Sequence, residues 1–238
     1  MASDAHAEGQ VTWKKLYTKH GVTISVGERN SFKLPILKGT GVLNVNLYHL
    51  LGIVEDVSRH NEWVDRVVQS ELIRRKDAFN ATAYMRFDFP WPASDRDGIL
   101  RVRVDRKWSP HHEVWIHFTR AKDAKKPPQK DAIRVPRSKG FIRLRWINPQ
   151  QTHVVYQIDT DPGGLLPKWL VRWIATDLPA KIIKGLQRQV KRTKGTYTDF
   201  IKRWDPRSSS QKDSPPVYSL VGVPNHLLKY PKTSLVPN

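Results

Sequence analysis

The stretch that decides the fold is Phe89-Pro90-Trp91-Pro92-Ala93-Ser94-Asp95-Arg96-Asp97, followed directly by Gly98. Prolines flank Trp91 and restrict the backbone there, so this part is predicted to be a stiff loop that presents the tryptophan. Arg96 and Asp97 stand where the loop passes into a strand. An ion pair at that junction is expected to hold the loop in place.

Alternating hydrophobic residues, the period of half-buried strands, extend on both sides of this loop. The short polar connections between the runs indicate an antiparallel meander. The residues that share a face within each run are Ala81, Ala83, Met85 and Phe87; Leu100, Val102 and Val104; Val114, Ile116 and Phe118; Ile142, Leu144 and Trp146; and Val154, Tyr156 and Ile158. In the third of these runs, Trp115, His117 and Thr119 lie on the opposite face.

The residues before the meander are expected to mix helices and strands. The spacing of Trp13, Leu16 and Tyr17 predicts a short amphipathic helix over residues 11–20. Strands are expected over 22–26, 32–37 and 43–46, with Pro35 confining the second to an edge or a bulge. Two helical segments are expected over 47–57 and 59–65.

A long amphipathic helix is predicted to begin near Pro167, where a first helical turn tolerates proline. Hydrophobic residues recur there at intervals of four and basic residues lie mostly elsewhere around the helix. The order of elements indicates an α+β fold in which one curved antiparallel sheet grips this helix, with a cavity between them. The domain is expected to span 11–204, and the Pro-, Ser- and Lys-rich residues 205–238 to form a tail. The hydrophobic residues of the helix are Leu170, Ile174, Leu178, Ile182, Leu186 and Val190.

The charge of the chain implies an anionic partner. Lys and Arg number 41 against 22 Asp and Glu, a formal net charge of +19, which suits an acidic membrane surface or a nucleic acid. The chain has no cysteine, so disulfides and thiol chemistry are excluded. No run approaches the ~18–20 apolar residues of a membrane-spanning helix. Residues 1–10 lack the regions of a secretory signal, which leaves either a cytoplasmic location or export after signal removal.

Three motifs, in this order and spacing, resemble the START domain family over roughly residues 13–204. They are Asp56 with Trp63, the segment Trp91–Asp97, and Asp161-Pro162-Gly163-Gly164-Leu165-Leu166-Pro167. The resemblance implies a helix-grip fold that holds one lipid in an internal hydrophobic tunnel. It also implies lipid exchange at a membrane when the terminal helix and a neighbouring loop open, by a monomer that uses no cofactor and no covalent chemistry.

The resemblance also implies roles for the motif residues. Trp91 and Pro92 match a Trp-Pro pair that inserts into membranes in ceramide-carrying members, and tryptophan does favour the membrane–water interface. Arg96 and Asp97 are interpreted as structural, and Gly163 with Gly164 as a hinge before the long helix. Gly98 stands where the family usually has an aromatic residue, which predicts either a wider tunnel or a looser loop.

The tunnel lining is predicted from the strand and helix faces. Of the polar positions used by ceramide-binding members, only Tyr156 is kept, because Met85 and Thr119 occupy the amide positions. The acid and arginine of sterol-carrying members fall at Ala83 and Val102, so the lipid, whether a sterol, a phospholipid or a sphingolipid, is left open. The expected lining residues are Ala83, Met85, Phe87, Val102, Trp115, His117, Thr119, Leu144, Trp146, Tyr156, Ile174, Leu178 and Ile182.

Two alternatives remain open. His117 with Asp88 or Thr119 could act as a general base in a helix-grip enzyme of the aromatase/cyclase or hydrolase kind; the interpretation adopted is that the protein is not an enzyme. His111 and His112 are expected in a solvated turn, without a metal. Nucleic-acid binding is not expected, because no aromatic–basic motif accompanies the basic residues. Those residues are Lys122, Lys125, Lys126, Lys130, Arg134, Arg137, Lys139, Arg143 and Arg145.

Overall fold

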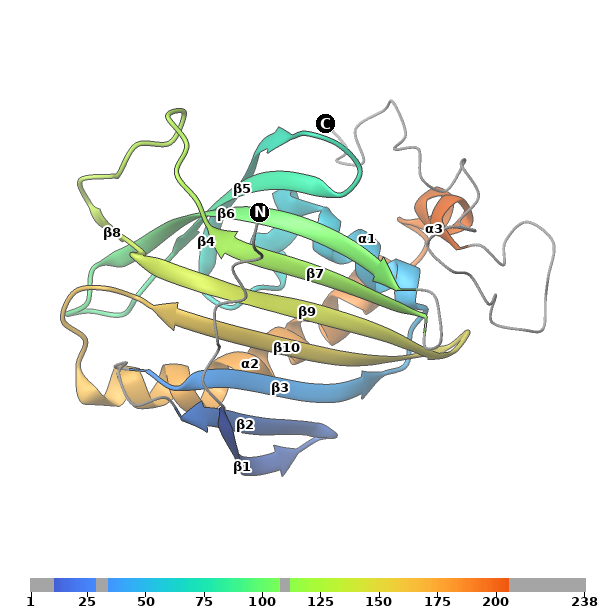
Figure 1. Cartoon of the computed structure of the whole chain (residues 1–238), viewed down its shortest axis with the longest axis horizontal. Coiled ribbons are helices and arrows are strands. Elements are labelled where there is room, and N and C mark those ends of the chain that lie inside the picture. Colours follow the sequence, from blue (N-terminus) through green and yellow to red (C-terminus); the bar gives the residue numbers. More distant parts are fainter. Residues whose placement is uncertain (1–10, 29–33, 108–111, 206–238) are drawn as a thin grey trace, which may run out of the picture.

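One curved sheet of ten strands forms most of the protein in this computed structural model, which describes residues 11–28, 34–107 and 112–205 (Figure 1). The order across the sheet is β1-β2-β3-β10-β9-β7-β6-β5-β4, and every neighbouring pair in it is antiparallel. A short strand, β8, pairs in parallel with the start of β6. The strands are β1 (Thr12–Lys19), β2 (Val22–Glu28), β3 (Ile36–Leu43), β4 (Val67–Arg75), β5 (Asn80–Phe87), β6 (Asp95–Lys107), β7 (Glu113–Arg120), β8 (Ala132–Arg134), β9 (Arg137–Asn148) and β10 (Gln151–Asp161).

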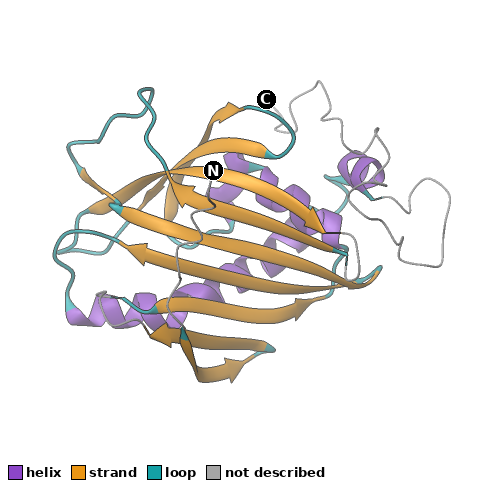
Figure 2. Cartoon of the chain, in the orientation of Figure 1, coloured by secondary structure: helices purple, strands orange, loops and turns teal. Residues whose placement is uncertain are grey.

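The helices are α1 (Leu47–Glu55), the 3-10 helix η1 (Val57–Glu62), α2 (Lys168–Arg192) and α3 (Thr198–Trp204). The helices α1 and α2 lie behind the sheet in the view of Figure 2 and cover its concave face, and α3 lies at one side of the sheet. The side chain of Asn46 caps α1 by accepting a hydrogen bond from the Tyr48 N–H at 2.8 Å. The long helix α2 contacts β2, β3 and β10, and α3 packs on α1. The α+β helix-grip architecture is therefore confirmed.

The prediction of a helix over residues 11–20 is wrong, because these residues form the edge strand β1. A β-bulge between Lys15 and Tyr17 puts one extra residue into the strand and breaks its period of two. The bulge explains why the apolar residues have a spacing close to that of a helix. Tyr17 reaches across to α2, where its hydroxyl donates to the Thr176 carbonyl at 2.8 Å.

Some boundaries also differ from the prediction. The strands expected over 32–37 and 43–46 are replaced by the single strand β3, which begins just after Pro35 and so avoids placing proline within the hydrogen-bonded ladder. Residues 32 and 33 lie outside the described part of the chain. The expected helical segments near 47–57 and 59–65 correspond to α1 and η1. Of the expected tail, only Asp205 is described.

The distance between α2 and the sheet depends on glycines at the points of contact. A Cβ on Gly39 of β3 would lie 3.0 Å from the Pro179 Cβ in α2. A Cβ on Gly185 of α2 would lie 2.0 Å from the Trp63 carbonyl oxygen, a distance that no pair of unbonded atoms tolerates. The helix therefore rests directly on β3 and on the backbone that follows η1.

We predict that Gly185→Ala destabilises the protein by about 1–3 kcal/mol, the usual cost of forcing atoms into a packed core. The sign of the change in unfolding free energy is diagnostic, because Gly→Ala at a solvent-exposed helix position stabilises the protein by roughly 0.8–1 kcal/mol. Urea unfolding followed by circular dichroism measures the effect, and Gln187→Ala, at an exposed position of α2, is the matched control. A higher midpoint for Gly185→Ala would show that the close contact does not exist.

Candidate functional site

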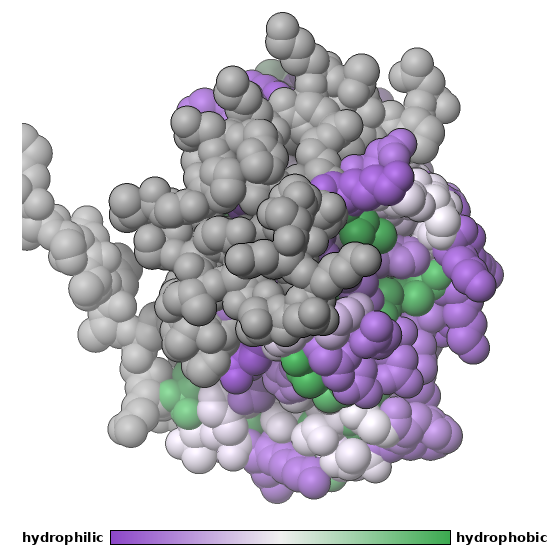
Figure 3. Space-filling model, turned by 90° about the vertical axis from the view of Figure 1, so that its right-hand side faces the viewer, coloured by the Kyte–Doolittle hydropathy of each residue, from purple (hydrophilic) through white to green (hydrophobic). Residues whose placement is uncertain are grey.

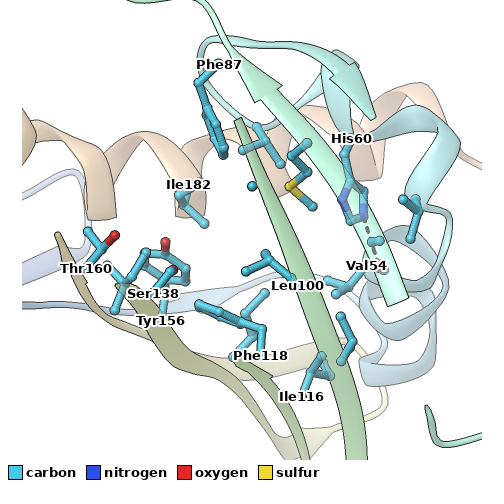
Figure 4. Close-up of a pocket in the computed structure, with 18 of the residues that line it drawn as sticks. Val54, His60, Phe87, Leu100, Ile116, Phe118, Ser138, Tyr156, Thr160 and Ile182 are labelled. Atoms are coloured by element: carbon cyan, nitrogen blue, oxygen red, sulfur yellow. Dashed lines mark hydrogen bonds between the residues drawn. The ribbon is translucent and has the colours of Figure 1, made fainter. Parts of the chain in front are cut away.

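A cavity of about 210 Å³ lies between the concave face of the sheet and the helices α1, η1 and α2. Figure 4 shows its wall, in which aliphatic and aromatic side chains from several strands point toward Ile182 of α2. One end is bordered by Phe89, Pro162 and Trp173, and we call it the loop end. Most of the wall is hydrophobic; these residues include Val54, Val57, Ala81, Ala83, Met85, Phe87, Leu100, Val102, Val104, Ile116, Phe118, Ile142, Tyr156, Ile158, Ile174, Leu178 and Ile182.

The cavity exists because α2 contacts only one half of the sheet. It packs on β2, β3 and β10, whereas the inward residues of β5, β6 and β7 line the open space. Eight of the residues predicted from the sequence border this space: Ala83, Met85, Phe87, Val102, Tyr156, Ile174, Leu178 and Ile182. Leu144 and Trp146 do not. They belong to the packed core beyond the cavity, and Leu144 is fully buried there.

Trp115, His117 and Thr119 do not line the cavity, contrary to expectation. Their neighbours Ile116 and Phe118 point into the cavity. Because successive side chains of a strand point to opposite faces, Trp115, His117 and Thr119 lie on the outer face of the sheet. There the Trp115 ring stacks on His117, with centroids 5.8 Å apart, and contacts Phe141 at 4.8 Å. A cavity base built from His117 is therefore ruled out in this fold.

The polar residues of the cavity wall were not singled out from the sequence. Glu55, the last residue of α1, accepts a hydrogen bond from Arg75 at 3.3 Å. Burial raises the pKa of Glu55 to about 7, against the lowering effect of Arg75 and Arg106. The Arg106 guanidinium lies over the Phe79 and Trp204 rings, at 4.7 and 4.3 Å. Glu55 follows an apolar helical run, a pattern that by itself predicts only a helix end.

His60 lies in η1 and Trp63 directly follows it, and both side chains border the cavity. Nε2 of His60 lies 2.8 Å from the Val54 carbonyl oxygen, the dashed line in Figure 4. Burial lowers the pKa of His60 to about 4, so the ring is neutral at pH 7. The two rings meet edge to face, with centroids 5.1 Å apart.

A second polar group lies on β9 and β10, nearer the loop end. Figure 4 shows Tyr156, Ser138 and Thr160 close together on one side of the cavity. The Thr160 hydroxyl donates to the Arg137 carbonyl at 3.0 Å. Burial raises the pKa of the Tyr156 hydroxyl, so it remains protonated at neutral pH. Tyr156 therefore offers an O–H group to the cavity.

Arg96 and Asp97 are both buried, but they do not pair with each other as expected. Successive residues of a strand point to opposite faces, so each braces a different neighbour. Arg96 donates to the carbonyls of Ser94, of Pro162 at 3.2 Å and of Gly163 at 2.9 Å. Asp97 instead accepts two hydrogen bonds from Arg134, the last residue of β8, at 2.7 and 2.9 Å. Arg96 thus connects the loop before β6 to the loop after β10.

The glycines of these segments have different surroundings. Gly163 and Gly164 have φ angles of +68° and +64°, a conformation that favours glycine. A Cβ on Gly164 would also lie 2.7 Å from Ile133. Gly98, in contrast, borders the cavity, and a Cβ there would meet no atom within 4 Å. The missing side chain at Gly98 leaves open space in the cavity wall.

Large apolar side chains are exposed around the loop end. Trp91 is 90% exposed, Leu165 is 91% exposed and Trp169, in the first turn of α2, is 52% exposed. The tryptophan of the Trp91–Pro92 loop therefore does not pack on its own sheet. Exposed Lys168 and Arg172 accompany Trp169 on α2. At the other end of the protein, the coloured surface in Figure 3 is mainly hydrophilic, with small separate apolar patches.

Other candidate sites from the sequence are not supported by the geometry. His112 is buried rather than solvated, and its Nε2 lies 2.5 Å from the Tyr48 hydroxyl; His111 lies outside the described residues. Among those residues, no cluster of three or more His, Asp or Glu could hold a metal ion. No helix of the described part combines the length and hydrophobicity needed to span a membrane.

Comparison with known proteins identifies the family. The model of the START domain matches residues 3–196. An uncharacterized protein of Pseudomonas aeruginosa is 27% identical over 79% of this chain and 89% of its own length. The phosphatidylcholine transfer protein of Bos taurus is 23% identical over 77% of this chain and 86% of its own length.

START domain-containing protein 10 of Mus musculus is 25% identical over 77% of this chain, a match that spans 63% of that relative's length. The crystal structure of a STAR-related lipid transfer protein from Xanthomonas axonopodis superposes with a TM-score of 0.68. It covers 75% of this chain and 98% of that chain, at 23% identity. The sheet that grips a helix around an apolar cavity, and the family match over most of the sequence, agree: this chain belongs to the START domain family.

Proposed function

We propose that the protein binds one lipid in its internal cavity and carries it between membranes without covalent chemistry. The observation that carries this proposal is the apolar cavity between α2 and strands β5, β6 and β7. Each CH₂ group of a lipid costs about 0.8 kcal/mol to expose to water, so an apolar cavity makes transport of a single molecule favourable. Residues 11–204 form the carrying unit in this proposal, and residues 205–238 a tail.

The loop end is the proposed site of lipid entry and of membrane contact. Trp91, Leu165 and Trp169 are exposed there, where aromatic side chains can enter the membrane–water interface. When the cavity opens, the start of α2 moves away from the loop that carries Trp91, and Gly163 and Gly164 form the hinge. The net charge of +19 favours membranes that contain acidic lipids. The protein acts as a monomer that associates peripherally with these membranes.

Lipid carriage is favoured over the two alternatives by the placement of side chains. The base that the sequence suggested for a helix-grip enzyme, His117, lies on the outer face and not in the cavity. A phosphatidylcholine transfer protein is among the relatives of this chain, which agrees with a lipid ligand. The basic residues support an acidic membrane as partner rather than a nucleic acid.

Gly98→Leu is predicted to block the cavity without damaging the fold. Its side chain would extend into open space that the lipid is proposed to occupy, and crowding of this kind costs about 1–3 kcal/mol, or roughly fivefold to a hundredfold in affinity. Extraction of lipid from vesicles, followed by mass spectrometry of the protein fraction, measures the loss. Thr119→Leu, on the outer face of β7, is the control and should extract as much lipid as the wild type. Equal extraction by both variants would place the ligand elsewhere.

We predict that Trp91→Ala combined with Leu165→Ala weakens binding to acidic vesicles by at least about tenfold. Together these exposed side chains contribute roughly 2–4 kcal/mol when buried in an interface. Flotation with phosphatidylserine-containing vesicles at increasing salt concentration gives the measurement. Ile147→Ala tests an exposed apolar residue at the opposite end of β9 and should bind normally. Unchanged binding of the double variant would exclude the loop end as the membrane contact.

A further inference from the structure

One wall of the cavity carries polar atoms that the described part of the protein leaves unsatisfied. They belong to Glu55, His60 and Trp63, whose residues are 7%, 6% and 3% exposed and border the cavity. Glu55 Oε1, His60 Nδ1 and Trp63 Nε1 have no hydrogen-bond partner among the described residues. Burying such atoms without partners costs free energy, which a polar group of a ligand would recover. We call these three residues the α1–η1 wall.

The hydrogen-bonding roles of two of these atoms follow from chemistry. The Val54 carbonyl can only accept, so His60 Nε2 carries the proton and donates to it. In a neutral ring Nδ1 is then an acceptor that faces the cavity. The indole Nε1 of Trp63 can only donate. The wall therefore requires a group that both donates and accepts, placed beside two rings whose centroids are 5.1 Å apart.

Glu55 adds a further polar atom to this wall. One of its oxygens accepts from Arg75, and the other, Oε1, has no partner among the described residues. With a pKa of about 7 this carboxyl is partly protonated at neutral pH, so Oε1 can accept or donate. A phosphodiester provides acceptors alone, so it cannot donate to His60 Nδ1. A quaternary ammonium group has no N–H to donate. A hydroxyl group donates once and accepts twice, and it is neutral.

Resting on the proposed lipid-carrying function, we propose that the α1–η1 wall binds a hydroxyl group of the lipid. The cargo is then a neutral, hydroxyl-bearing lipid rather than phosphatidylcholine. Trp63 Nε1 donates to the hydroxyl oxygen, the hydroxyl donates to His60 Nδ1, and the hydrocarbon part lies along Met85, Leu100 and Ile182. Sterols and diacylglycerols share this chemistry, and the experiment separates them.

The test uses the full chain and matched pairs of lipids. In each pair, one lipid has a free hydroxyl group, and in the other a methyl group replaces the hydroxyl hydrogen. One set of phosphatidylcholine vesicles contains dioleoylglycerol and its 3-O-methyl ether in equal amounts. The other contains cholesterol and cholesterol methyl ether. After incubation, the protein is separated from the vesicles, and mass spectrometry gives the amount of each lipid that it retains, phosphatidylcholine included.

The wild-type protein is expected to retain one of the two hydroxyl lipids about fivefold to tenfold over its methyl ether, the effect of one good hydrogen bond. Trp63→Phe and His60→Leu should each reduce that ratio toward one. Trp204→Phe is the matched control, because its indole Nε1 is also buried without a partner in the described structure but does not border the cavity. Trp63→Phe keeps the test valid if His60→Leu does not fold.

Three results overturn the inference. Equal retention of both members in both pairs, or retention of phosphatidylcholine above either hydroxyl lipid, excludes a hydroxyl site while leaving the carrier function intact. A preference that Trp63→Phe leaves unchanged excludes the α1–η1 wall. A protein that retains no lipid of any kind contradicts the proposed function itself.

Discussion

Gly185 of α2 lies against the backbone at Trp63, and Gly39 of β3 lies against Pro179, and these contacts determine how α2 sits on the sheet. At these points the helix approaches as closely as two backbones can. The sheet curves away toward β5, β6 and β7, so the helix cannot fill the space in front of those strands. The cavity is thus a geometric result of close packing on one side and curvature on the other. Gly98, which has no side chain, leaves further space open in the cavity wall.

The sequence predicted the fold well where one periodicity dominates. The alternation around Ala83, Val102 and Ile142 identified strands whose inward residues border the cavity, and the spacing from Leu170 to Leu186 identified α2. The prediction failed at β1, where a bulge near Lys15 mimics helical spacing. It also misplaced Trp115 and His117, since alternation shows which residues share a face but not which face is buried when both carry aromatic rings.

The candidate site was predictable only in its apolar part. Lining residues on strands and α2 follow from periodicity, but Glu55, His60 and Trp63 come from a helix end and a 3-10 turn, where no simple period applies. Their importance depends on which of their atoms lack partners, and that is a property of the folded structure. Family membership, in the same way, identifies the cavity but not the lipid. Relatives that are 23–27% identical share a fold in which the polar side chains of the wall can differ.

Arg96 has a consequence for how the loop end can move. Its guanidinium holds carbonyls from two loops that are far apart in the sequence, one carrying Trp91 and the other carrying Leu165. Separating those loops would leave a buried cation facing no acceptor. Displacing them together preserves every one of its hydrogen bonds. The loop with Trp91 and the residues up to Gly163 therefore move as one body, whereas Leu165, which follows the proposed Gly163–Gly164 hinge, moves with the start of α2.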